Sequence, residues 1–135
     1  MDEFTFFVDG LPRAKQSTQW SPRSKCYYTK PEIKNWQNRV NWYCLAKWRP
    51  RGLIPKTTAV ILEATFIYFT RKKYALSWKL SKPDLCNLIK PIEDAMEGVI
   101  YENDSQIVQY QKIEKIFTNA WEKEEGVRIK LKFVS

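Results

Sequence analysis

The segment 82–107 is the part of the chain whose residue pattern most restricts the fold. Between residues 85 and 97 apolar side chains recur at the three- and four-residue spacing of an α-helix, and Gly98 then supplies a residue that commonly ends one. One side of this helix carries Leu85, Leu88, Ile89, Ile92, Ala95 and Met96. The other side carries Cys86, Asn87, Lys90, Glu93, Asp94 and Glu97. The pattern predicts a helix that packs one side into a core and turns the other toward a cleft.

Four further segments have the composition and alternation of β-strands. Residues 58–69 are rich in β-branched and aromatic types and favour a long central strand. Residues 127–133 alternate apolar and basic side chains, and residues 3–8 and 106–117 also favour strands, with a turn expected over 119–126. These segments predict a mixed sheet of about four strands.

A second helix is expected before the long strand. Thr29 can cap it, Pro31 suits its first turn, and apolar residues then recur at helical spacing to about Trp48. The polar, proline-containing segment 11–28 is expected to be a long surface loop. The predicted fold class is α+β: a single domain over residues 1–135, with a mixed sheet packed with two main helices.

The predicted cleft is acidic, whereas the rest of the chain is basic. Residues 84–104 hold six of the 15 acidic residues and one lysine, and the remainder holds 22 Lys/Arg and nine acids. Residues 10–62 alone hold eleven Lys/Arg against Glu32, interleaved with four tryptophans, each of which is more often a core residue than a base-stacking one. This contrast favours a protein that attracts a nucleic acid through its surface and holds a divalent cation at one acidic spot.

Several classes of protein do not agree with the composition. The chain has no histidine, and its three cysteines lack CxxC spacing, which argues against a disulfide framework, a zinc site and histidine-based acid/base catalysis. The first residues are acidic where a signal peptide is basic, and no apolar run is long enough to span a bilayer. We therefore expect a soluble protein of the cytoplasm, without a membrane partner.

Taken singly, the residues of the acidic segment have ordinary structural explanations. Asp84 suits a helix N-cap, Asp104 a turn, and Cys86 a small inert filler. Lys90 and Asp94 have the spacing of a solvated helix pair, which contributes about 0.3–0.5 kcal/mol. Glu93 and Glu97 are likewise expected to face solvent. Only the combined order of Asp84, Asn87, Lys90 and Asp104 favours a chemical site.

Three motifs in fixed order, KPDLCNLIK, EDAMEG and NDSQI, resemble the signature of the RusA-type Holliday junction resolvases. A Gly10-x-Pro12-x-x-Lys15 segment and a basic final strand extend the resemblance more loosely. The resemblance implies a RusA-like fold and a metal-dependent, structure-selective DNA endonuclease that resolves four-way (Holliday) junctions in recombination and repair. It also implies a homodimer, for which the exposed side of Trp42 and the outer face of the long strand are candidate interfaces.

Carried over by position, the resemblance implies a role for each residue of the motifs. The metal-binding carboxylates are Asp84 and Asp104, the essential lysine is Lys90, and Asn87 supports them together with Asp94. The implied cofactor is Mg²⁺, with Mn²⁺ as a possible substitute, and the implied partner is a DNA four-way junction. Lys90 would neutralise charge on the phosphate or help to deprotonate the attacking water.

Two positions depart from the family pattern. Cys86 stands where the pattern has an aspartate of the catalytic set, and Asn103 stands where it has the first aspartate of a later pair. A thiol in place of a carboxylate removes both a charge and a hard oxygen ligand, so we predict weak metal retention and reduced or absent cleavage with Mg²⁺, with Mn²⁺ better tolerated. Asn103 keeps an oxygen and is the milder change, a weaker metal ligand.

The basic residues expected to contact DNA lie in the first loop and before the acidic helix: Arg13, Lys15, Arg23, Lys25, Lys72, Lys73 and Lys82. Two other functions remain open at this point. In a non-catalytic junction or nucleic-acid-binding protein, the basic loop and tryptophans would bind and the carboxylates would be structural, which Cys86 makes a serious competitor. A small assembly protein of a mobile element would explain the charge but not the acidic cluster.

Overall fold

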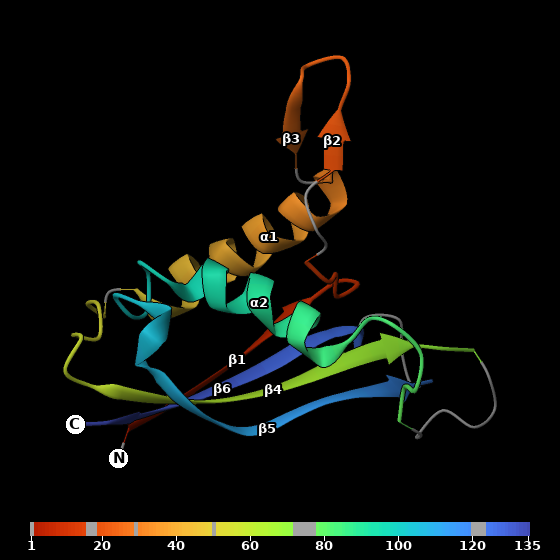
Figure 1. Cartoon of the computed structure of the whole chain (residues 1–135). Coiled ribbons are helices and arrows are strands. Elements are labelled where there is room, and N and C mark those ends of the chain that lie inside the picture. Colours follow the sequence, from red (N-terminus) through yellow and green to blue (C-terminus); the bar gives the residue numbers. More distant parts are fainter. Residues whose placement is uncertain (1, 16–18, 29, 50, 72–77, 120–123) are drawn as a thin grey trace.

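A four-stranded mixed sheet forms one layer of the protein (Figure 1). The computed structural model describes the whole chain except residues 1, 16–18, 29, 50, 72–77 and 120–123. The strands are β1 (Asp2–Asp9), β4 (Ala59–Phe69), β5 (Ile107–Thr118) and β6 (Gly126–Val134), in the spatial order β1-β6-β4-β5. β4 and β5 run parallel, and the other pairs are antiparallel. The four predicted strands and the mixed α+β class are confirmed.

Two helices, α1 (Pro31–Trp48) and α2 (Leu85–Met96), cover one face of the sheet (Figure 1). Both predicted helices are confirmed. The cap of α1 differs from the expectation, because Lys30 is the N-cap residue and the predicted cap, Thr29, lies outside the described residues. Within the described part of the chain, neither helix is long and apolar enough to cross a bilayer.

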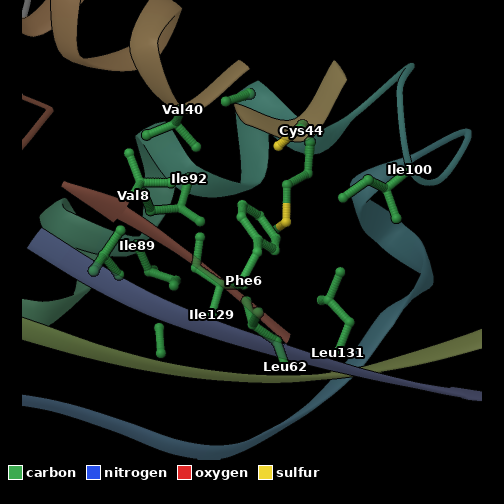
Figure 2. Packing of buried hydrophobic residues seen from close by; sticks show 14 of the residues in the cluster. Phe6, Val8, Val40, Cys44, Leu62, Ile89, Ile92, Ile100, Ile129 and Leu131 are labelled. Carbon is green, nitrogen blue, oxygen red and sulfur yellow. The ribbon is translucent and has the colours of Figure 1, made fainter. Parts of the chain in front are cut away.

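The core fills the space between the helices and the sheet (Figure 2). The apolar side of α2 contributes Leu88, Ile92 and Met96, all fully buried, which agrees with the helical spacing of these residues. Leu62 of β4 and Ile129 of β6 meet them from the sheet. Since burying such a side chain contributes about 1.5–3 kcal/mol, this packing fixes which side of α2 faces outward.

The segment 11–28, expected to be a loop, contains a small hairpin within its described residues. Its strands are β2 (Gln19–Ser21) and β3 (Cys26–Tyr28), and the hairpin projects away from the sheet beyond the first turns of α1 (Figure 1). Strands of three residues are too short to show an alternation of apolar and polar positions, which is why the sequence did not reveal them. The turn displays Arg23 and Lys25, both exposed, and Lys25 adopts a positive φ of 52°.

Gly126, at the start of β6, lies so close to β1 that it has no room for a side chain. A Cβ there would lie 2.1 Å from the carbonyl oxygen of Val8 and 2.7 Å from Cζ of Phe7. We expect Gly126→Ala to lower the free energy of unfolding by about 2 kcal/mol, because a backbone oxygen cannot move aside without disturbing the β1–β6 ladder. Urea denaturation measures the change.

The matched control for this substitution is Gly52→Ala. Among the described residues, no heavy atom lies within 4 Å of a Cβ built at Gly52. The control should therefore unfold at nearly the same urea concentration as the unmodified protein. Equal midpoints for the two variants would contradict the close β1–β6 approach.

Candidate active site

Lys90 is the centre of a chain of alternating charges on the outward side of α2. Its Nζ lies 3.2 Å from Oδ2 of Asp104 and 3.3 Å from Oδ1 of Asp94, one helical turn further along. The second oxygen of Asp94 lies 3.2 Å from Nζ of Lys15. We call Lys15, Asp94, Lys90 and Asp104 the ion-pair chain. It brings together residues from the first loop, α2 and the turn before β5.

The two carboxylates keep Lys90 protonated. The hydrogen bond to Asp104, together with the charge of Asp94, raises the pKa of Lys90 above its ordinary value despite partial desolvation. A lysine that stays in its ammonium form at neutral pH has no lone pair with which to accept a proton. The geometry therefore favours charge neutralisation over proton abstraction for this side chain.

The turn that carries Asp104 is fixed at both ends. Asp104 opens the short 3₁₀ helix η1 (Asp104–Gln106), and its backbone N–H donates to Oε1 of Glu97 at 3.0 Å. Gln106, which is buried, donates its side-chain amide to the carbonyl oxygens of Pro55 (2.8 Å) and Thr58 (3.1 Å). Glu97 is half-buried and holds the turn through its carboxylate. The expectation that Glu97 faces solvent is therefore wrong.

Asn103 forms the cap of this turn. Its Oδ1 accepts a hydrogen bond from the N–H of Ser105 at 2.9 Å, and its own N–H donates to Oε1 of Gln106 at 2.9 Å. This reciprocal arrangement is a capping box. The side-chain oxygen that was predicted to be a weaker metal ligand therefore has a structural partner.

Asp84 faces a basic cleft at the start of α2. It occupies the N-cap position, but within the described chain its side chain makes no capping hydrogen bond, and Oδ2 lies 3.8 Å from Nζ of Lys82 instead. The cleft has a volume of about 610 Å³. Its polar lining includes Arg13, Lys30, Glu32, Lys79, Lys82, Asp84 and Asn87.

Two cations of this cleft, Lys30 and Lys79, were missed by the sequence analysis. Lys30 immediately precedes α1, and Lys79 lies over the rings of Tyr68 and Phe117 at 4.8 and 5.1 Å from their centroids. Burial, and then the charge of Lys115, lower the pKa of Lys79. Their only sequence signal is that both belong to basic stretches that flank a predicted helix.

The basic residues predicted to contact DNA are exposed wherever the structure describes them. Arg13, Lys15, Arg23, Lys25 and Lys82 are all exposed, and Lys72 and Lys73 lie outside the described residues. The predicted support residue Asn87 acts through its backbone: its carbonyl oxygen accepts the N–H of Lys15 at 2.8 Å. This bond ties the first loop to α2.

Cys86 opens onto a second cavity, between α2 and β5, with a volume of about 430 Å³. The cavity is lined by Leu85, Cys86, Ile89, Lys90, Glu93, Tyr110 and Ile113. Glu93 is only 7% exposed, and the hydroxyl of Tyr110 donates a hydrogen bond to its Oε1. The expectation that Glu93 faces solvent is therefore wrong, because β5 passes over this part of the helix and covers it.

The sequence resemblance implies a divalent cation at these carboxylates. Oxygen donors of the type that Mg²⁺ prefers are present, but the ammonium of Lys90 bridges Asp94 and Asp104, and Cys86 supplies a thiol. Across the described residues, no three His, Cys, Asp or Glu side chains are grouped so that they could hold a metal ion. The arrangement as it stands does not fit a bound ion.

A family model and two relatives of this chain all carry the same protein-family name. A family model described as "Endodeoxyribonuclease RusA" matches residues 9–132. A "Crossover junction endodeoxyribonuclease rusA" of Lactococcus phage r1t is 33% identical over 110 residues, covering 78% of this chain and 82% of the phage protein. A protein of the same name from Aquifex aeolicus (strain VF5) is 27% identical over 134 residues, covering 98% and 93% of the two chains.

Proposed function

The chain belongs to the RusA family of endodeoxyribonucleases, and we propose on this premise that it hydrolyses phosphodiester bonds in four-way DNA junctions. The observation that carries the proposal is the ion-pair chain, in which Lys90 meets Asp104 although the two residues lie on different elements. Both residues belong to the motifs by which the sequence resembles the family. The names of the two relatives favour a nuclease over a non-catalytic binding protein.

The chemical role proposed for Lys90 follows from its charge. Negative charge develops on the phosphate oxygens when a phosphodiester is attacked, and a cation fixed nearby stabilises that charge. Asp94 and Asp104 hold the ammonium at the outward side of α2 and keep it protonated. Lys90 is therefore proposed to neutralise the phosphate rather than to activate the water.

The basic cleft supports a site for the DNA backbone beside these residues. Arg13, Lys30, Lys79 and Lys82 line it, and it reaches the start of α2, where backbone N–H groups and the helix dipole also favour an anion. Such contacts position a phosphate without reading a base. Junction selectivity then depends on where the phosphates of a branched DNA lie.

Magnesium dependence and a homodimer are further parts of the proposal. Asp84 and Asp104 would be the metal ligands, with Asn103 as a weaker one, and Asp104 would have to part from Lys90 to bind an ion, which is consistent with weak retention. A junction requires two cuts, and a dimer with two equivalent sites matches its two-fold symmetry. Trp42, 62% exposed on α1, is a candidate for the dimer interface, and light scattering tests this state.

Cleavage of labelled DNA tests the proposed function directly. The protein is incubated with a four-way junction and with a linear duplex of the same sequence, in Mg²⁺, in Mn²⁺ and in EDTA. We expect paired cuts in the junction, little cutting of the duplex, and faster cutting in Mn²⁺ than in Mg²⁺. Tight junction binding without cutting in any metal would instead support a non-catalytic junction-binding protein.

The basic cleft gives a second measurable expectation. We expect Arg13→Ala combined with Lys82→Ala to reduce the slope of log affinity against log salt by about 2, because each lost phosphate contact removes roughly one unit. Titration of a labelled junction at several salt concentrations measures the slope.

Lys47→Ala is the matched control for this pair. Lys47 is exposed in the last turn of α1 and is not among the residues that line the cleft. An equal change in slope for the control would mean that the cleft has no special part in binding.

A further inference from the structure

The cavity beside Cys86 contains a carboxylate despite the missing aspartate at position 86. Glu93 lies seven residues after Cys86 on α2, a spacing of about two turns that places both side chains on the same side of the helix. Both residues line the cavity, and Lys90 lies between them in the sequence and lines it too. The charge that Cys86 lacks is therefore present two turns further along the helix.

The carboxylate of Glu93 is held in one place. The Tyr110 hydroxyl from β5 donates to Oε1, and the hydroxyl of buried Tyr101 donates to the backbone carbonyl of Glu93 at 2.8 Å. Tyr110 is itself half exposed at the cavity, so it connects the buried acid to the surface. A side chain fixed at both its backbone and its carboxylate loses little conformational freedom on meeting a substrate.

The electrostatic surroundings of Glu93 connect it with the ion-pair chain. Burial raises the pKa of Glu93, whereas the Tyr110 hydrogen bond and the charge of Lys90 lower it; the charges of Asp104 and Asp94 raise it further. Glu93 directly precedes Asp94 on α2, lies about one helical turn from Lys90, and lines the same cavity as Lys90. A carboxylate is costly to bury, and a leucine would pack as well at a purely structural position.

We propose that Glu93 supplies the acidic group that the family pattern places at position 86, and that Tyr110 is the positioning residue that holds it. Glu93 then joins Asp84, Lys90 and Asp104 among the residues proposed for the reactive centre of this chain. This inference rests on the proposed nuclease function, which it deepens by assigning one more acidic residue to the site.

The inference is tested by asking whether an aspartate at position 86 restores cleavage that is lost when Glu93 is replaced. Four proteins are compared on the labelled junction: the unmodified chain, Glu93→Gln, Cys86→Asp and the double variant Cys86→Asp/Glu93→Gln. Glutamine keeps the shape of Glu93 and an oxygen that accepts the Tyr110 hydroxyl. We expect Glu93→Gln to cut at least about tenfold more slowly with junction affinity within about twofold, and the double variant to cut nearly as fast as Cys86→Asp.

A structural role for Glu93 would give a different result. Thermal unfolding of each variant shows whether the fold is intact, and Glu3→Gln is the control for loss of one negative charge, because Glu3 is an exposed residue of β1 that pairs with Lys130. The inference is overturned if Glu93→Gln cuts like the unmodified chain, or if the added aspartate fails to restore cutting to the double variant.

The same set of proteins separates the inference from the function on which it rests. If Cys86→Asp cuts and the unmodified chain does not, the nuclease function stands and Glu93 does not replace the missing aspartate. If neither protein cuts any junction in either metal, the nuclease function itself is wrong, and the inference falls with it.

Discussion

Cys86→Asp is expected to raise the rate of junction cleavage in Mg²⁺ by about tenfold or more. The substitution adds a negative charge and a hard oxygen donor to a side chain that is exposed at the cavity shared with Lys90. Mg²⁺ prefers such oxygen donors to a thiol. Single-turnover cleavage of a labelled junction, at saturating protein, measures the change without contribution from product release.

The control for this substitution places the same acid elsewhere. Cys26 is also exposed, but it belongs to β3 of the projecting hairpin, where its Sγ lies 3.1 Å from the hydroxyl of Ser24. Cys26→Asp should leave the cleavage rate unchanged or lower it slightly through weaker DNA binding. If Cys86→Asp is no faster than the unmodified protein, position 86 has no part in the reaction.

Lys90→Ala is expected to reduce turnover by about 10²–10³-fold while junction affinity changes only a few-fold. The ammonium is proposed to stabilise charge that develops only during the reaction, whereas the cleft and the first loop supply most of the binding. Cleavage under single-turnover conditions and junction titration in EDTA measure the two quantities separately. Equal losses of turnover and affinity would assign Lys90 to binding alone.

Two further variants define the role of this cation. Lys90→Arg keeps the charge and should retain part of the turnover, although its planar group cannot reproduce both ion pairs at the same distances. Lys112→Ala is a control on β5, where the lysine pairs with Glu114 at 3.2 Å. The control should cut at the normal rate, because Lys112 does not line either cavity.

Much of the fold could be predicted because its elements are long and regularly patterned. The alternation in β6 and the helical spacing in α2 each express one packed side, and both elements appear with nearly the predicted bounds. The β2–β3 hairpin could not be predicted, since three-residue strands show no period. The burial of Glu93 also escaped the sequence, because it depends on Tyr110, which lies 17 residues further along the chain.

The sequence named residues for a candidate site but did not specify how their side chains lie. The motif order indicated that Lys90 and Asp104 belong together, and the structure joins them directly. Asp84 was expected to cap α2, but the nearby Lys82 attracts its side chain toward the basic cleft. Side-chain direction at a helix end depends on such neighbours, and residue spacing does not specify it.

Substitutions at Gln106 are expected to impair cleavage, although its side chain takes no direct part in the proposed reaction. Its amide hydrogen-bonds the segment that leads into β4. The position of Asp104 therefore depends on residues that have no part in the proposed chemistry. In a survey of random substitutions, defects at Gln106 would group with defects in catalysis. Suppressors of such defects would be sought among mutations that tighten residues 54–58, which hold the turn through Gln106.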